Sequence, residues 1–257
     1  MESKKITTAQ GCEVRVYTTG QGEPLVYLHG VTGVMKDDPF LTALGRHYTV
    51  YAPVLPGFED SGGEDEVDGV LSAALHGYNV INALGLSCPI LMGHCLGGMI
   101  AAEMAAIAPN DISRLILLSP MGIWDDAHPI PDLFATLPFE LPGLMFNNVQ
   151  LGEELLASGM DFNDAEFLTD FLVGNAKRMG MAGKFLFPIP DRGVKKRLYR
   201  IKAPTRLIWG ENDALVSPSY AGIYAREIAH SETALIPDGG HMAQYEVTDA
   251  VIDALIS

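Results

Sequence analysis

Cysteine and basic side chains are scarce in this sequence. Three cysteines among 257 residues are too few, and odd in number, for the disulfide framework that staples small secreted domains, so we expect a reducing, cytoplasmic location. Lys and Arg number 17 against 32 Asp and Glu, which gives a formal net charge of -15. A field of that sign repels phosphate backbones and anionic lipid, so we expect no nucleic-acid partner and no membrane partner.

Long apolar runs and metal-binding spacings are missing as well. No segment reaches the roughly 18 consecutive apolar residues that a membrane helix needs, and no signal-peptide run follows Lys4 and Lys5. No His-x-x-x-His or Cys-x-x-Cys spacing occurs, and Gly20 and Gly22 lack the lysine of a phosphate-binding loop. We therefore expect no metal and no cofactor, a small-molecule substrate, and a monomer or homodimer.

Strand-length apolar runs alternate with helical spacings along most of the chain. Hydrophobic residues make up 48% of it, enough to bury a large core. The pattern predicts strands at 13–19 (a half-exposed edge strand), 24–28, 48–54, 89–92, 114–118, 205–209 and 233–236. It predicts helices at 68–84, 97–108, 219–229 and 247–256. Continuous apolar strands separated by helices predict an α/β fold, with a mostly parallel central sheet and helices on both faces.

Residues 122–201 interrupt this alternation. They contain no convincing strand, but stretches rich in Leu, Phe and Met with helical or loop-like patterns at 131–146, 152–158 and 165–184. We predict a core domain of residues 1–121 and 202–257, with residues 122–201 inserted after a late strand as a helical cap. Prolines at 131, 138 and 142 break any long regular helix, so some apolar side chains are expected to face the strand ends. The alternative is that they only pack the segment against itself.

The segment Gly93-His94-Cys95-Leu96-Gly97-Gly98 marks Cys95 as a candidate nucleophile. It follows a predicted strand and opens a predicted helix, and a side chain in so sharp a turn needs small residues two positions before and after it. The start of the helix favours an anion, here a thiolate. The alternative is a small buried hydrophobe, which is how we interpret Cys12 and Cys88.

Two further residues follow predicted strands and complete a catalytic set. Asp213 lies after the strand at 205–209, and His241 lies after the strand at 233–236. Nucleophile, acid and base then come in the chain order Cys95, Asp213, His241, which predicts a triad at one edge of the sheet. Asp125 and Asp126 also follow a strand and are the alternative acids.

Backbone N–H groups are expected to bind the oxyanion of the reaction. We assign one to Leu96, after the nucleophile, and the other to Val31 in the loop that follows an early strand. Each such donor is worth roughly 3 kcal/mol in the transition state. His29 is expected to shape this loop by hydrogen bonding. The expected substrate-binding residues are mostly apolar: His29, Gly30, Met121, Trp124, Phe134, Phe139, Met145, Phe146, Val216 and Met242.

Taken together, these segments resemble α/β-hydrolase-fold enzymes with a helical cap. The segments that carry the resemblance are His29-Gly30, Pro56-Gly57-Phe58 with Ser61, residues 93–98, Trp209-Gly210-Glu211-Asn212-Asp213, and Gly240-His241. They are similar to the esterases, lactonases and carbon–carbon-bond hydrolases of that superfamily, most of which carry Ser where this chain has Cys95. Dienelactone hydrolases share the Gly-x-Cys-Leu-Gly-Gly turn but usually lack so large a cap.

The resemblance implies a hydrolase that works through an acyl-enzyme. Its target would be an ester, thioester, lactone or activated carbon–carbon bond next to a carbonyl in a small, partly apolar substrate. Two alternatives stay open, an acyltransferase that uses the same acyl-enzyme and a non-catalytic ligand-binding member of the fold.

Overall fold

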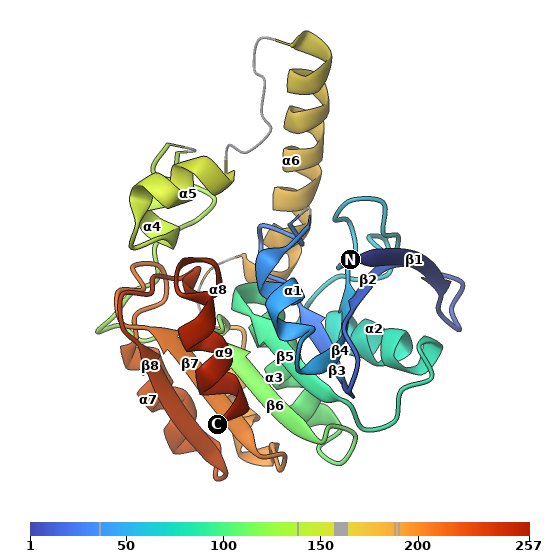
Figure 1. The fold of residues 1–257 in the computed structure, drawn as a ribbon, viewed down its shortest axis with the longest axis vertical. Helices are drawn as coiled ribbons and strands as arrows, with labels where there is room; N and C mark the ends of the chain where they lie inside the picture. The colour runs from blue at the N-terminus through green and yellow to red at the C-terminus, as the bar shows by residue number, and fades with distance from the viewer. Residues whose placement is uncertain (36, 138, 157–163, 188, 190) are drawn as a thin grey trace.

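A single sheet runs through the molecule in the computed structural model, with helices on both of its faces (Figure 1). The structure describes residues 1–35, 37–137, 139–156, 164–187, 189 and 191–257. In this part of the chain the sheet has eight strands in the order β1-β2-β4-β3-β5-β6-β7-β8. They are β1 (Glu2–Thr7), β2 (Glu13–Thr19), β3 (Glu23–Leu28), β4 (Tyr48–Pro53), β5 (Ile90–His94), β6 (Arg114–Leu118), β7 (Thr205–Gly210) and β8 (Ser231–Ile236).

The strands from β3 to β8 are parallel, and only β2 and β1 run antiparallel to their neighbours. The predicted α/β fold with a mostly parallel sheet is therefore confirmed. The prediction that residues 13–19 form an edge strand is wrong, because β1 pairs with β2 on its outer side. β1 has the sequence ESKKIT and is exposed almost throughout. It therefore lacks the alternation of apolar and polar residues from which a strand is predicted.

The register of the strands aligns the carboxyl ends of several neighbouring strands at one edge of the sheet. Leu28 at the end of β3 is opposite Gly93 in β5, and Gly93 is opposite Leu117 in β6. On the far side, Gly210 of β7 is opposite Ile236 of β8. Loops that follow these strands therefore emerge at the same edge of the sheet, where ligands bind in open parallel sheets.

Helices on the two faces bury the two larger hydrophobic cores. The first face carries α1 (Pro39–Leu44) and α9 (Thr248–Ile256), with the short α8 (Ala243–Glu246) preceding α9. The other carries α2 (Val70–Ala83), α3 (Cys95–Ile107) and α7 (Ser219–Glu227). Helix α3 is buried on every side from its first residue to Ala106, which is why its sequence is Ala, Gly and Met instead of a one-sided apolar stripe.

Between β6 and β7 the described residues form helices and loops without a strand, and we call residues 122–201 the insert. Its helices are α4 (Leu141–Met145), α5 (Val149–Leu156) and α6 (Ala165–Leu186), followed by the 3-10 turns η1 (Val194–Lys196) and η2 (Leu198–Arg200). Figure 1 shows α4, α5 and α6 above the strand ends, with the far part of α6 projecting from the body. Pro138 and the end of the predicted 152–158 element lie outside the described residues.

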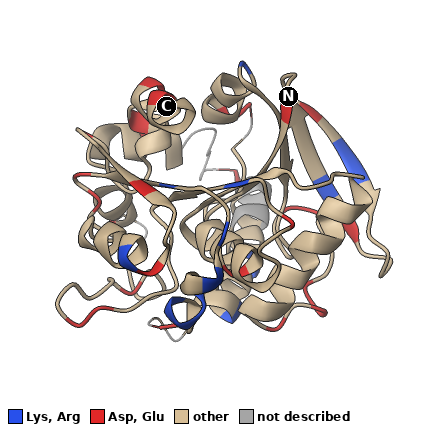
Figure 2. Ribbon diagram, turned by 90° about the horizontal axis from the view of Figure 1, so that it is seen from below, with Lys and Arg blue, Asp and Glu red and all other residues tan. Residues whose placement is uncertain are grey.

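Charge is unevenly placed on this frame. Figure 2 shows acidic residues spread around the molecule and basic residues gathered in a few places. Residues 192–202 hold six of the 17 basic side chains: Arg192, Lys195, Lys196, Arg197, Arg200 and Lys202. One of them is held internally, since the Arg197 guanidinium pairs with the buried Glu103 at 2.6 Å. Among the described residues, no helix is both long enough and apolar enough to cross a bilayer.

Candidate active site

The turn between β5 and α3 places Cys95 in strained backbone. Its φ is +54°, in the left-handed region that side chains other than glycine seldom adopt. A Cβ on Gly93 would collide with the carbonyl of Gly97, and one on Gly97 would collide with the carbonyl of Leu28. Glycine is thus required on both sides of Cys95. The thiol sits at the N-terminus of α3, whose dipole favours a negative charge there.

Asp213 is held rigidly at the end of β7. Its Oδ1 accepts hydrogen bonds from the backbone N–H groups of Leu215 at 3.0 Å and Val216 at 2.8 Å. Its Oδ2 accepts from Nδ1 of His241 at 2.8 Å. The carboxylate therefore has a fixed direction, and it fixes the ring and the tautomer of His241.

The other ring nitrogen of His241 is left free. Because Nδ1 bonds Asp213, Nε2 faces away from it, and within the described chain this buried nitrogen has no hydrogen-bond partner. Burial lowers the pKa of His241, but the negative charges of Asp213 and Cys95 outweigh burial and raise the pKa to about 10. The structure thus brings Cys95, Asp213 and His241 together, and the free Nε2 suits proton exchange with the thiol.

Asp125 and Asp126, the alternative acids, have other partners. Asp125 accepts from Nδ1 of His128 at 2.9 Å, and this bond holds the pKa of its carboxyl below the usual value. Asp126 accepts from the indole N–H of Trp124 at 2.8 Å. Asp213 is therefore the carboxylate that orients His241.

The loop after β3 lies against the Cys95 turn. A Cβ on Gly30 would lie 2.9 Å from Nδ1 of His94 and 3.1 Å from Cβ of Cys95. His29 shapes this loop as expected, since its Nδ1 donates to the carbonyl of Gly30 at 2.7 Å and its Nε2 accepts from the N–H of Leu55 at 2.9 Å. Burial lowers the pKa of His29 to about 4, so the ring is neutral. Val31 follows directly in this loop and is buried.

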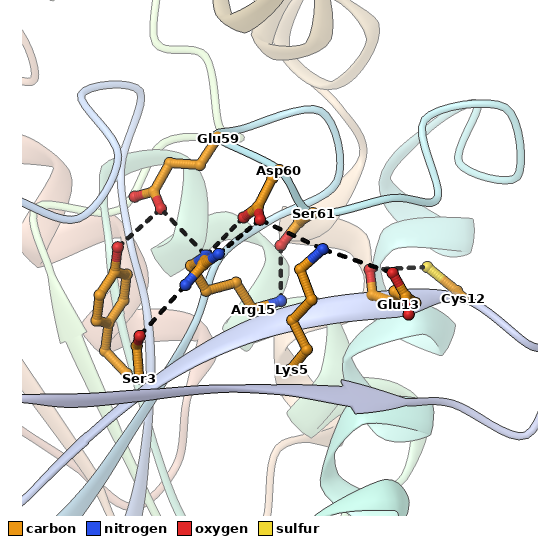
Figure 3. Close-up of polar contacts among 9 residues, drawn as sticks. Ser3, Lys5, Cys12, Glu13, Arg15, Glu59, Asp60 and Ser61 are labelled. Atoms are coloured by element: carbon orange, nitrogen blue, oxygen red, sulfur yellow. Dashed lines mark hydrogen bonds and ion pairs between the residues drawn. The ribbon is translucent and has the colours of Figure 1, made fainter.

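An ion-pair cluster braces the same region from outside (Figure 3). Arg15 of β2 binds both carboxylate oxygens of Asp60, at 2.5 and 2.6 Å, and its backbone N–H donates to Oγ of Ser61 at 3.0 Å. Lys5 of β1 adds a contact to Asp60 at 3.3 Å. The cluster ties the antiparallel strands to the loop after β4, which supplies the Leu55 N–H that holds His29.

The insert is attached to the site at two places. At one, the N–H of Met242 donates to the carbonyl of Met145 at 2.9 Å, and Glu246 accepts from the N–H groups of Gly240 and Asn148 at 2.7 and 2.8 Å. These bonds join the end of α4 to the loop of His241. At the other, α6 covers the loop after β4.

Contacts of α6 with that loop are close and partly charged. A Cβ on Gly57 would collide with the side chain of Met181. Lys177 pairs with the Glu64 carboxylate at 2.7 Å, and Lys184 donates to the Glu64 carbonyl at 2.6 Å. The insert therefore bridges the loop of His241 and the loop after β4, which holds His29 through the N–H of Leu55.

Most of the expected substrate-binding residues lie inside the molecule. Seven are buried: His29, Gly30, Met121, Met145, Phe146, Val216 and Met242. Trp124 and Phe134 are half-buried against the main core. Phe139 is an exception, because 75% of its surface is exposed.

Arg178 of α6 is a residue that sequence reasoning missed. It is partly buried, and its guanidinium donates to Oδ1 of Asn175 at 2.8 Å, while no carboxylate of the described residues pairs with it. Loss of hydration lowers the pKa of Arg178, and its charge contributes to the lowered pKa of His29. A cation without a carboxylate partner among the described residues therefore lies near His29 and the loop after β3. In the sequence Arg178 stands out only as a basic residue one helical turn before Met181 and Ala182, which are buried.

Known proteins similar to this chain include lipases and dienoate hydrolases. A sequence profile described as "Alpha/beta hydrolase family" matches residues 25–254. Lipase 1 of Psychrobacter immobilis is 26% identical, with 98% of this chain and 82% of that protein covered. The 2-hydroxy-6-oxo-6-phenylhexa-2,4-dienoate hydrolase of Burkholderia cepacia is 28% identical, with 92% and 87% covered.

Solved structures show the same fold. A bacterial membrane phospholipase A superposes with a TM-score of 0.77 at 22% identity, with 99% of this chain and 85% of that chain covered. A meta-cleavage product hydrolase from Pseudomonas fluorescens IP01 superposes with a TM-score of 0.71 at 18% identity, with 98% and 96% covered.

Proposed function

Because the chain belongs to the alpha/beta hydrolase family, we propose that it hydrolyses a bond next to a carbonyl with Cys95 as the nucleophile, His241 as the base and Asp213 as the residue that orients the base. The bond is an ester, a thioester, a lactone or an activated carbon–carbon bond. The observation that carries this proposal is the buried pair of His241 and Asp213 at 2.8 Å, with a free Nε2 beside the strained turn of Cys95.

The reaction follows from these positions. His241 takes the thiol proton on Nε2, and the Cys95 sulfur forms a bond to the carbonyl carbon. The oxyanion is bound by the backbone N–H groups of Val31 and Leu96. When the intermediate collapses, the leaving group departs with the proton from Nε2, and the acyl group stays on sulfur as a thioester. Water, deprotonated by His241, then releases the acid and restores the thiol.

The charge on Cys95 gives His241 different proton affinities in the two halves of the cycle. Negative charge on the sulfur contributes to the raised pKa of His241. Acylation removes that charge, so the pKa of His241 falls in the acyl-enzyme. The neutral ring of the acyl-enzyme takes a proton from the attacking water, holds it until the sulfur is released as a thiolate, and then returns it to the sulfur. This suits a base used twice in one cycle.

The residues around the site suit a partly apolar substrate that carries an acidic group. Met145, Phe146 and Met242 offer apolar surface at the junction of the insert and the His241 loop. Arg178 offers a cation with no carboxylate partner in the described chain, on the side of the oxyanion loop. One relative is named as the hydrolase of a dienoate, which is a carboxylate. This match favours an acid whose reactive carbonyl lies a few bonds from the carboxylate.

In this proposal the insert (residues 122–201) is a cap domain. It covers a core domain made of residues 1–121 and 202–257. Cys95 and His241 have no exposed surface, so a substrate reaches them only when the insert or a flanking loop moves aside. Closure then keeps bulk water from the thioester.

Mass spectrometry of the intact protein tests the function. The protein is exposed to a panel of aryl esters, thioesters, lactones and vinylogous diketones, and its mass is followed with time. A hydrolase gains one acyl group, located on Cys95 by peptide mapping, and loses it in water. An acyl group that leaves only when a thiol or alcohol is added identifies an acyltransferase instead. Absence of both adduct and turnover across the panel identifies a ligand-binding protein.

Replacing Arg178 with methionine is expected to raise KM for an aryl ester that carries a free carboxylate by about 10- to 100-fold. The reason is that a hydrogen bond between charged groups is worth about 1.5–3 kcal/mol, and Met keeps most of the apolar stem of Arg178. Steady-state kinetics with the matching neutral ester is the control, and its KM should stay within about twofold. The Arg178→Lys variant should recover part of the loss. Equal losses on both esters would mean that Arg178 does not bind the acid.

A further inference from the structure

His94 lies where the three loops of the site meet. It directly precedes Cys95, and its ring is fully buried with its centroid 4.9 Å from that of His241. Its Nδ1 lies 2.9 Å from the place that a Cβ on Gly30 would occupy, so the oxyanion loop packs directly on it. The proposed mechanism gives His94 no role, although a polar ring at this depth is costly unless it is hydrogen-bonded.

Both nitrogens of the His94 ring have partners, one in the loop of His241 and one in α8, which follows that loop. Nε2 lies 2.9 Å from the backbone carbonyl of His241, and Nδ1 lies 3.4 Å from Nε2 of Gln244. A carbonyl only accepts, so Nε2 carries the proton, and Nδ1 accepts from the Gln244 amide. This arrangement requires the neutral ring with its proton on Nε2.

The surroundings keep the ring in that form. Burial is the largest cause that holds the pKa of His94 well below its usual value, and the neighbouring His241 lowers it further. Gln244 is itself fully buried, with its amide nitrogen also 3.9 Å from the sulfur of Met242. His94 therefore stays uncharged while His241 gains and loses a proton beside it.

We propose that His94 is a positioning residue for the proposed reaction: it holds the backbone of His241 against the Cys95 turn, and Gln244 fixes the tautomer that makes this hold possible. Asp213 orients the ring of His241 from one side, and His94 anchors its main chain from the other. A hydrogen bond from the residue next to the nucleophile thus helps to set the distance between base and nucleophile. This inference rests on the proposed function.

Two substitutions separate the donor from the bulk of the ring. His94→Gln places an amide N–H near the position of Nε2, whereas His94→Leu fills the space without a donor. With an aryl ester, His94→Leu should lower kcat by about 10- to 100-fold, because small misplacements of a catalytic group cost that much, while KM stays within about twofold. His94→Gln should recover most of kcat. A merely structural ring would give losses in thermal stability that do not follow kcat.

Gln244→Leu provides a second test, with His94 left in place. It should lower kcat several-fold, and the double variant with His94→Leu should lose no more than His94→Leu alone, because both act through one hydrogen-bond chain. Should His94→Leu fail to fold, the comparison of Gln244→Leu and His94→Gln with the wild-type chain still decides: unchanged kcat in Gln244→Leu overturns the proposal.

Cys95→Ala, assayed in parallel, distinguishes the two levels of inference. If Cys95→Ala retains turnover, the proposed function fails. If Cys95→Ala is inactive while His94→Leu keeps the wild-type kcat, the function stands and the role of His94 is refuted.

Discussion

Turnover of an aryl ester is expected to fall by a factor of about 10⁴ or more when Cys95 is replaced by alanine, because a triad without its nucleophile leaves only the oxyanion donors and substrate binding. The fold should persist, since Cys95 contributes a small side chain to a core that surrounds it with apolar groups. Steady-state kinetics and thermal unfolding are measured on the same preparation. The expected result is an inactive protein that unfolds within a few degrees of the wild type.

The other two thiols provide matched controls for Cys95→Ala. Cys88→Ala changes an exposed residue, and Cys12→Ala changes a buried one in a separate small core. Burial and the nearby Glu66, Glu64 and Glu13 raise the pKa of the Cys12 thiol, so less of it is thiolate at neutral pH than of an ordinary cysteine. Both variants should keep their turnover. Activity lost with Cys12 or Cys88 but retained in Cys95→Ala would refute Cys95 as the nucleophile.

Asp213→Asn is expected to lower kcat by about 10⁴-fold with little loss of stability. The asparagine Oδ1 still accepts from the N–H groups of Leu215 and Val216, so the loop keeps its shape. Its amide then faces Nδ1 of His241 with a donor, which forces the proton of the neutral ring onto Nε2 and blocks the side that must accept from Cys95. The loss therefore comes from the wrong tautomer. The pH dependence of kcat in both proteins measures it.

Asp125→Asn is the control for the acid. Asp125 pairs with His128 in a loop of the insert, so its loss should leave kcat within about twofold. A silent Asp213→Asn together with a large loss in Asp125→Asn would reverse the assignment. A second consequence concerns charge: without the carboxylate, the pKa of His241 falls, because burial is then opposed by Cys95 alone.

The sheet and the positions of Cys95, Asp213 and His241 could be predicted because each depends on local pattern. Buried parallel strands are continuous apolar runs, and turns with small residues mark their ends. Several short elements escaped this reasoning, among them β1 and α1. β1 has no apolar face, since its stability comes from pairing with β2 and from the ion pairs of Lys5. The six-residue helix α1 is too short for a helical period to show.

The contacts of the insert depend on long-range geometry, which composition does not encode. Phe139 and Phe146 are the same residue type seven positions apart, yet Phe139 is exposed and Phe146 is buried against Gly152. The proposed roles of Arg178 and His94 likewise depend on residues far away in the chain. Arg178 acts on His29, and His94 bonds the backbone of His241. A single sequence gives the residue types of such pairs but not which of them meet.

The complete burial of Cys95 also bears on oxidative damage. Peroxides convert thiolates to sulfenic acid and then to irreversible higher acids where the sulfur is within reach of solvent. Cys95 has no accessible surface, whereas Cys88 lies exposed on the way into β5. Oxidants in solution therefore modify Cys88 first. Cys95 is oxidised only during the intervals when the insert or a flanking loop is displaced. The rate of its oxidation therefore measures how often the site opens to solvent.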